Sequence, residues 1–176
     1  MTHAASALDV RVAALREEDI PELVRLARGI WYAHYPSIIT VEQIEYMLDQ
    51  RYRAEVIRSQ LASGAAWWDK LLLDGAMVAF ACCEPGKHAD EMKLDKLYVR
   101  YDLRRQGYGS LLMRHVEQRA QARGCTRLYL QVNKNNRSAI DFYLRYGFTV
   151  SAAGRFDIGS GFIMDDYIMS KALGRA

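Results

Sequence analysis

The stretch R-R-Q-G-Y-G, residues 104–109, follows the apolar run Leu94 to Val99 and precedes an amphipathic helical pattern from Ser110 to Arg123. Its two glycines let backbone N–H groups approach an anion without obstruction by Cβ atoms. The N-terminus of the following helix adds a partial positive charge. Two arginines in the stretch, and Arg100 before it, supply guanidinium donors that suit phosphate oxygens. The stretch therefore predicts a phosphate-binding turn between a strand and a helix.

Two familiar phosphate-binding turns fit poorly. A P-loop requires Lys-Ser or Lys-Thr after its last glycine, and neither follows Gly109. The dinucleotide-binding pattern requires a third small residue where Leu112 stands, and no acidic residue clearly takes the ribose role. A glycine-containing turn that merely begins a helix stays open as the plain alternative.

A second strand-helix unit follows. Residues 126–132 predict a strand, and the sequence then reads N-K-N-N-R-S-A-I-D-F-Y-L-R-Y-G-F from residue 133 to residue 148. Asn135 or Asn136 can cap the helix at its start, and Gly147 suits the position just after its end. One face of this helix carries Ala139, Phe142, Tyr143 and Tyr146.

These two units resemble the GNAT acetyltransferase superfamily. Its pyrophosphate loop reads Arg or Gln, two residues, Gly, one residue, Gly or Ala, which Arg104, Gly107 and Gly109 match in register. Its second signature is matched by Asn136, Ala139, Phe142, Tyr143, Gly147 and Phe148. The two signatures lie roughly 30 residues apart, as a βα repeat places them. The chain is identified as a member on this basis.

The element order predicts an α/β fold of the α+β kind, with one mixed sheet and helices on both faces. The resemblance implies the GNAT acyltransferase fold, whose sheet is mostly antiparallel, over residues 10–173. Thr40 and Gln43 predict a helix start, and Asp74-Gly75 predicts a hairpin turn. The expected strands are 10–14, 66–73, 76–83, a strand ending at 99, 126–132, 148–152 and 162–170. The expected helices are 19–35, 40–61 with a break near Tyr52, 110–123 and 136–146.

Length and composition predict one compact α/β domain, since the chain has 176 residues and is 51% hydrophobic. The resemblance implies that this is a single GNAT domain over residues 1–176, with residues 1–9 expected as a flexible tail. A net charge of +3 from 24 basic and 21 acidic residues, without blocks of one sign, argues against a nucleic-acid partner. No segment has the apolar length of about 20 residues that spans a bilayer, and no secretion signal begins the chain. We expect a soluble, cytoplasmic protein without a membrane partner.

Cysteines and histidines predict no metal site. The cysteines lack C-x-x-C spacing, and no histidines stand four apart on a helix. We expect the thiols to be buried as small apolar groups. The residues concerned are Cys82, Cys83, Cys125, His3, His34, His88 and His115.

The resemblance implies that acetyl-CoA is the acyl donor. Its pyrophosphate is expected on the N–H groups of residues 106–110, and its pantetheine arm is expected to pair with the backbone of residues 97–99. An N–H group near Val99 is expected to polarise the thioester carbonyl. The predicted cofactor-binding residues are Leu97, Tyr98, Val99, Arg104, Arg105, Gln106, Gly107, Tyr108, Gly109, Ser110 and Asn136.

The resemblance also implies catalytic roles. Tyr143 is the predicted general acid that protonates the departing thiolate, with a core tyrosine as the alternative. Asn136 could instead serve only as a helix cap. Asp95 is the predicted general base, although Glu91 is also available, strand alternation could turn Asp95 to solvent, and ordered waters serve some family members.

The amine acceptor stays open between polyamines or other small amines, antibiotics, amino acids, and peptide N-termini or lysines. The resemblance places its site near Trp31, Tyr32, His34, Tyr35 and the segment 154–169. Aromatic rings with Asp157, Asp165 and Asp166 would suit a cationic amine. Alternatively, the rings belong to the core and the aspartates to a solvated hairpin.

The leading interpretation is an acetyl-CoA-dependent N-acetyltransferase that acts by direct transfer in a ternary complex, because no cysteine or serine is placed as a nucleophile. A non-catalytic acyl-CoA sensor or assembly module is the second interpretation, and an ATP-binding protein is the third. The oligomeric state, monomer or homodimer, is not encoded in any motif.

Overall fold

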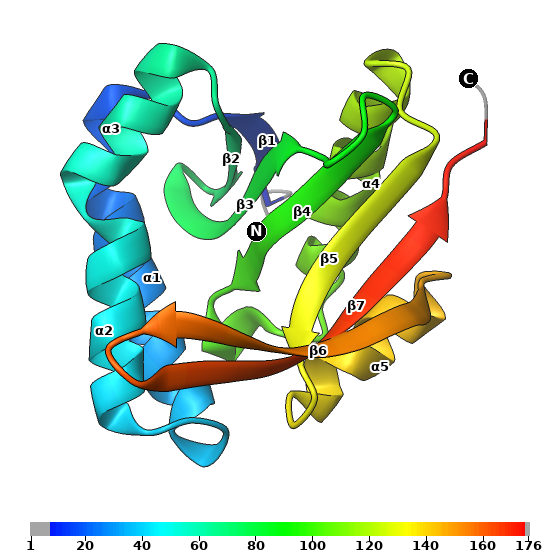
Figure 1. Cartoon of the computed structure of the whole chain (residues 1–176). Helices are drawn as coiled ribbons and strands as arrows, with labels where there is room; N and C mark the ends of the chain where they lie inside the picture. The colour runs from blue at the N-terminus through cyan, green and yellow to red at the C-terminus, as the bar shows by residue number, and fades with distance from the viewer. Residues whose placement is uncertain (1–7, 175–176) are drawn as a thin grey trace, which may run out of the picture.

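The computed structural model describes residues 8–174, which contain a seven-stranded sheet in the order β1-β2-β3-β4-β5-β7-β6 (Figure 1). Neighbouring strands are antiparallel except β4 and β5, which are parallel. The strands are β1 (Val10–Ala14), β2 (Trp67–Leu73), β3 (Ala76–Pro85), β4 (Glu91–Val99), β5 (Arg127–Asn133), β6 (Thr149–Gly159) and β7 (Phe162–Ala172). The helices are α1 (Ile20–His34), α2 (Val41–Tyr52), α3 (Ala54–Ser63), α4 (Tyr108–Ala122) and α5 (Arg137–Arg145), with short 3-10 turns η1 (Glu17–Asp19), η2 (Tyr35–Ser37) and η3 (Tyr101–Leu103).

Helices cover both faces of this sheet, as predicted. In Figure 1, α1, α2 and α3 stand on one side, and α4 and α5 on the other. The core accordingly has two parts. The part on the side of α4 and α5 includes Leu112, Met113, Val116, Leu128, Leu130, Phe148 and Met169, and the part on the side of α1 to α3 includes Leu23, Ile30, Trp31, Ile44, Tyr52, Trp68 and Phe80.

Local sequence signals explain several boundaries. The side chain of Thr40 accepts a hydrogen bond from the N–H of Gln43 at 3.2 Å, which caps α2. Arg53 is extended, with φ −62° and ψ 140°, and separates α2 from α3, so the predicted break is confirmed. Asp74 and Gly75 have φ of 49° and 82°, as the predicted tight β2–β3 turn requires.

The strand β6 is longer than predicted. The sequence predicts a closing strand near residues 148–152. In the structure β6 pairs with β7 as far as Gly159, opposite Phe162. Cross-strand pairing therefore overrides local propensity in this hairpin, which is closed by Ser160 and Gly161 in left-handed conformations.

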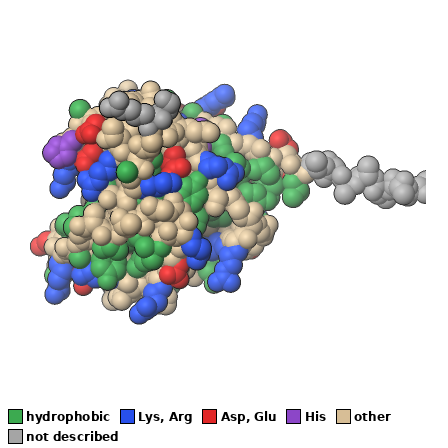
Figure 2. Space-filling view, turned by 90° about the vertical axis from the view of Figure 1, so that its right-hand side faces the viewer, with side chains coloured by type: hydrophobic (Ala, Val, Ile, Leu, Met, Phe, Trp, Pro, Cys, Tyr) green, Lys and Arg blue, Asp and Glu red, His purple; other side chains and the backbone are tan. Residues whose placement is uncertain are grey.

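The molecular surface carries charges of both signs. On the face shown in Figure 2, Lys and Arg side chains are scattered among acidic and apolar ones. Among residues 8–174, no helix has the length and apolar character needed to cross a membrane. Most of the predicted tail, residues 1–9, lies outside the described residues, but Asp9 is hydrogen bonded through its backbone to Asp74.

A β-bulge interrupts β4. Cys83 of β3 pairs with Leu94 and the preceding Cys82 pairs with Lys96, so Asp95 is an extra residue. A bulge bends its strand and disturbs the ladder on either side. Correspondingly, β4 pairs with β5 only from Glu91 to Leu94, and the two strands separate beyond that point.

The side chain of Asp95 is 5% exposed and is surrounded by three cations. Arg51 donates to both carboxylate oxygens at 2.7 Å, Lys93 lies 2.9 Å away, and Lys96 forms a further close ion pair. Burial by itself raises the pKa of Asp95, but Arg51, Lys96 and Lys93 outweigh it and hold the pKa well below its usual range. This cluster of charges fixes the bulge.

Replacing Asp95 by Asn should lower the free energy of unfolding by about 3 kcal/mol at pH 7, because Lys96 and Arg51 lose their counter-charge in a buried place. Urea unfolding would measure the change. Since the pKa of Asp95 is lower in the folded than in the unfolded chain, the stabilisation is complete above about pH 4 and declines as the pH falls further.

Asp49→Asn is the matched control on α2, because its carboxylate forms only an exposed pair with Arg53. We expect that change to cost less than about 0.5 kcal/mol. Equal losses in the two variants would contradict a structural role for the Asp95 cluster.

Candidate active site

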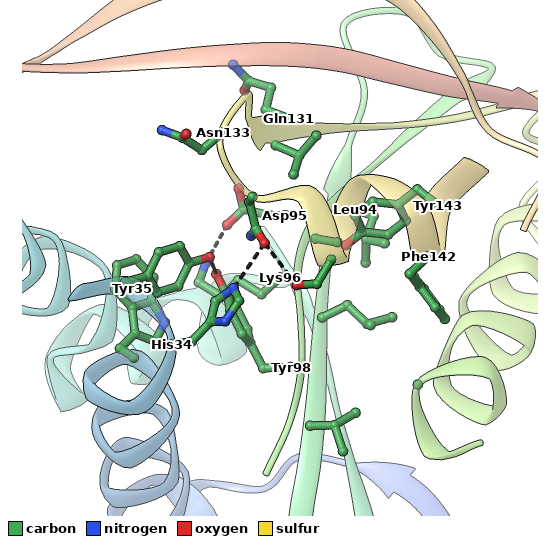
Figure 3. A pocket seen from close by; sticks show the side chains of 18 of the residues that line it. His34, Tyr35, Leu94, Asp95, Lys96, Tyr98, Gln131, Asn133, Phe142 and Tyr143 are labelled. Atoms are coloured by element: carbon green, nitrogen blue, oxygen red, sulfur yellow. Dashed lines mark hydrogen bonds and ion pairs between the residues drawn. The ribbon is translucent and has the colours of Figure 1, made fainter. Parts of the chain in front are cut away.

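A cleft of about 1650 Å³ opens where β4 and β5 separate at their carboxyl ends (Figure 3). The carboxyl ends of neighbouring parallel strands are a common place for ligands in α/β proteins. His34 and Tyr35 border it from the side of α1, and Phe142 and Tyr143 border it from α5. The volume exceeds that of an ordinary small-molecule pocket, so two substrates can fit together.

One wall of the cleft is an unpaired strand edge. Within residues 8–174, β4 has no partner on its β5 side from Asp95 to Val99, and β5 has none on its β4 side from Gln131 to Asn133. Leu97, Tyr98 and Val99 line the cleft, as predicted. Such an edge offers backbone hydrogen bonds to an extended ligand in the way a sheet accepts an added strand.

The glycine-containing turn lies at the end of this edge. Gly107 has φ +90° and immediately precedes α4. In the part of the chain that the structure describes, no hydrogen bond uses the N–H groups of residues 106–110; the loop's first helical bond is from the N–H of Leu111 to the carbonyl of Gly107. Gly107, Gly109 and Ser110 line the cleft, whereas the side chains of Gln106 and Tyr108 do not. The turn therefore presents free N–H donors beside the unpaired edge.

The three arginines near this turn differ in their contacts. Arg100 is paired with Asp102 at 2.7 Å. Arg104 lies over the ring of Tyr101 and bonds to His34. Arg105 lines the cleft, is exposed, and forms no ion pair with any residue in 8–174. Arg105 is thus the best placed of the three to meet a phosphate group.

Two hydrogen bonds connect three residues that line the cleft, Arg104, His34 and Asn136. Arg104 NH1 lies 3.0 Å from His34 Nδ1, and His34 Nε2 lies 3.0 Å from Asn136 Oδ1. A neutral imidazole with its hydrogen on Nε2 satisfies both bonds. Burial and the charge of Arg104 lower the pKa of His34 and favour this neutral form, although the bond to Asn136 opposes them. The sequence contains no signal for these two hydrogen bonds, because the three residues are far apart along the polypeptide.

Asn136 is the residue before α5, but its side chain does not cap the helix. The amide lines the cleft and bonds to His34 instead. The side chain of Asn136 therefore does not act as the helix cap that the sequence left open.

Tyr143 lies on α5 with 8% exposure and lines the cleft. No hydrogen bond to its hydroxyl occurs within residues 8–174. Burial, together with the nearby Tyr35, raises the pKa of Tyr143 above its usual value, so the phenol is protonated at neutral pH. It can therefore donate a proton but not accept one.

Neither carboxylate proposed from the sequence as a base is suited to that role. Asp95 borders the cleft, but its depressed pKa makes it a poor proton acceptor at neutral pH. Strand alternation does not turn it to solvent, because the bulge directs it into the cation cluster. Glu91 lies at the other end of β4, paired with Arg127, and does not line the cleft. We therefore do not propose Asp95 as the general base.

The acceptor-side residues divide into two groups. Trp31, Tyr35 and Asp166 line the cleft, whereas Tyr32 is on the surface beside Arg28. Two aspartates of the hairpin face elsewhere: Asp157 accepts from the N–H of Gly159, and Asp165 pairs with Lys134. The sequence did not distinguish these aspartates, since only strand register determines which one points inward.

The cysteines behave as small core residues. Cys82, Cys83 and Cys125 are buried and free. Burial raises the pKa of each thiol, to about 12 for Cys82. Within residues 8–174, no group of three or more His, Cys, Asp or Glu side chains could hold a metal ion.

Comparisons with known proteins agree with this geometry. Residues 22–148 match the family model described as the acetyltransferase (GNAT) family. An uncharacterized N-acetyltransferase of Mycobacterium tuberculosis is 32% identical over 155 residues, which cover 88% of this chain and 98% of that protein. The ribosomal protein bS18-alanine N-acetyltransferase of Salmonella typhimurium is 34% identical over 86 residues, 49% of this chain and 57% of that one.

Among solved structures, the PaiA N-acetyltransferase of Thermoplasma acidophilum, in complex with coenzyme A, aligns with a TM-score of 0.79. It is 23% identical and covers 93% of this chain and 99% of its own, so it supports the fold. The family match spans most of the chain and includes both glycine-turn and α5 motifs. The chain therefore belongs to the GNAT family of acetyltransferases.

Proposed function

We propose that this chain is an acetyl-CoA-dependent N-acetyltransferase, working as a single GNAT domain, that transfers the acetyl group directly to a primary amine in a ternary complex. The observation that carries the proposal is the unpaired edge of β4, which ends at the free N–H groups of residues 106–110. An extended chain attached to a diphosphate fits this combination. Acetyl-CoA is such a molecule, and it supplies the activated acetyl group when bound.

The residues of the cleft divide the binding of acetyl-CoA among them. The N–H groups of residues 106–110 and the side chain of Arg105 bind the diphosphate. The backbone of Leu97 to Val99 holds the pantetheine arm, and an N–H group near Val99 polarises the thioester carbonyl. The amide of Asn136 is available to the same arm once it leaves His34.

Tyr143 is the proposed general acid. Its phenol is protonated, has no partner among residues 8–174, and borders the cleft. A donor of this kind can protonate the leaving thiolate. Direct transfer is favoured over an acetylated cysteine, because all three thiols are buried and have raised pKa values.

Tyr143→Phe should lower kcat about 100-fold, because it removes the proton donor while leaving the ring in place. The measurement is release of free CoA at saturating acetyl-CoA with the best amine from a panel of peptides, amino acids, polyamines and aminoglycosides. The affinity for CoA, measured by calorimetry, should change by less than about twofold.

Tyr146→Phe is the matched control. Tyr146 lies on the same helix face, but its side chain does not line the cleft. We expect wild-type turnover from it. If the Tyr143→Phe variant also turns over normally, Tyr143 is only a core tyrosine.

Arg105→Ala should weaken CoA binding about tenfold, because a charge-assisted bond to the diphosphate is lost. Arg114→Ala is the control, since Arg114 is exposed on α4, beyond the loop that carries Arg105. Calorimetric titration at low and high salt should show the difference between the variants shrinking as salt is added. Unchanged affinity in the Arg105 variant would remove that residue from the diphosphate site.

The same titrations separate the alternative functions. An ATP-binding protein would bind ATP in preference to CoA. A sensor or assembly module would bind CoA species without releasing thiol to any amine. Binding of acetyl-CoA together with amine-dependent thiol release is the result that the proposed function requires.

A further inference from the structure

Asp166 is a buried carboxylate in the acceptor half of the cleft. It lies on β7 between Asn133 of β5 and Gly154 of β6, and it is 5% exposed. No hydrogen bond or ion pair from within residues 8–174 reaches either carboxylate oxygen, and Oδ1 is fully buried. An unpaired buried carboxylate is costly unless a ligand or water meets it. Its place in the cleft wall indicates the direction from which that partner comes.

Several charged and polar side chains lie near Asp166. Tyr35 lies within electrostatic range of both Asp166 and Tyr143. Arg51 from α2, Lys134 after β5 and Asp165 on the same strand are the other charges that act on Asp166. Burial, reinforced by Asp165, raises the pKa of Asp166 to about 6, against the opposing effect of Arg51 and Lys134. A carboxylate of this pKa is a far better proton acceptor at neutral pH than Asp95.

The charges around Asp166 restrict the acceptor. Three carboxylates among residues 8–174 line the cleft: Asp95, Asp141 and Asp166. Asp95 is fully engaged with Arg51, Lys93 and Lys96, and Asp141 is exposed on α5, on the other side of the sheet from α1 and α2. A second ammonium group of an acceptor bound at Asp166 would therefore lie near the cations Arg51 and Lys134. Only one terminal nitrogen of Arg51 is bonded to Asp95 among the described residues, so its other N–H groups can serve a neighbouring carbonyl or carboxylate.

We propose that Asp166 binds the acceptor ammonium and takes its proton, and that the acceptor presents a single α-amino group, as a peptide N-terminus or an amino-acid derivative does. This inference rests on the proposed function and names its general base and substrate class. The proposal is supported by the burial of Asp166, by its lack of a hydrogen-bond partner within residues 8–174, and by the nearby charge of Arg51. The basicity of the acceptor agrees, since α-amino groups have a pKa of about 8 and alkyl amines about 10.4, so an α-amine yields its proton to a carboxylate more readily.

One proton passes from the ammonium nitrogen to Oδ2 of Asp166, the carboxylate oxygen that is not fully buried, and the lone pair left on nitrogen forms the C–N bond to the acetyl carbonyl carbon. The C–S bond breaks with its electron pair on sulfur, which takes the proton of Tyr143. The second proton of the nitrogen restores Tyr143 through solvent, and Asp166 releases its proton to bulk water. The net products are the amide, free CoA and one proton.

The test compares the wild-type chain, Asp166→Asn and Asp165→Asn, with tri-alanine amide as the α-amine probe. Nα-acetyl-lysine amide and spermidine serve as alkyl-amine probes. For the wild type, kcat/KM should rise with pH through about 6, where Asp166 ionises, and fall above about 8, where the α-ammonium ionises. The α-amine should exceed both alkyl amines in kcat/KM by at least about tenfold.

Asp166→Asn should lower kcat/KM about 100-fold and abolish the acidic limb, leaving a rate that rises with free amine. Asp165→Asn, whose carboxylate pairs with Lys134 and does not line the cleft, should keep the acidic limb and the wild-type plateau, with the limb moved to lower pH because Asp165 no longer raises the pKa of Asp166. His34 also titrates below its ordinary pKa, so the criterion is the loss of the limb in Asp166→Asn alone. Calorimetry should give all three proteins the same CoA affinity within about twofold.

Different failures have different meanings. If Asp166→Asn keeps the wild-type rate and profile, Asp166 is not the base. If spermidine or the lysine derivative is preferred, the acceptor class is wrong. If the wild type binds CoA but acetylates none of the probes or any other amine, the proposed function fails and this inference fails with it.

Discussion

The extra residue at Asp95 is the feature on which the rest of the site depends. Without it, β4 could continue to pair with β5 beyond Leu94, and no strand edge would be left open. The bulge persists because the carboxylate it carries is buried against Arg51, Lys93 and Lys96. Removing that carboxylate would strand cations in a place of low dielectric constant. A charge cluster that looks catalytic therefore has a structural role.

The two faces of the sheet contribute different kinds of recognition. The side of α4 and α5 presents backbone N–H groups and an unpaired strand edge, which suit the repeated chemical features of a diphosphate and an extended arm. The side of α1 and α2 presents aromatic rings and charged side chains, including Trp31, Tyr35 and Arg51. Backbone recognition tolerates many sequences, whereas side-chain recognition depends on each residue. This explains why the proposed donor site was easier to predict from the sequence than the proposed acceptor site.

The hydrogen bonds Arg104–His34–Asn136 connect elements on these two sides of the cleft. The three residues come from different parts of the fold. Arg104 lies in the glycine-containing loop, His34 ends α1, and Asn136 directly precedes α5. The imidazole of His34 is held neutral by burial and by the neighbouring guanidinium. The end of α1 is thereby bonded directly to the glycine-containing loop and to the residue that precedes α5.

By itself, the sequence determined the family, the order of elements, the glycine turn, the break after α2 and the β2–β3 turn. Each of these depends on short-range backbone preferences or on apolar periodicity, which are written in neighbouring residues. Only the tertiary structure decided the length of β6, the burial of Asp95, the partners of His34, and which of Asp157, Asp165 and Asp166 faces the cleft. These follow from strand register and from charges far apart in the chain. A shift of one residue along a strand reverses the direction of every side chain, and local sequence does not contain that information.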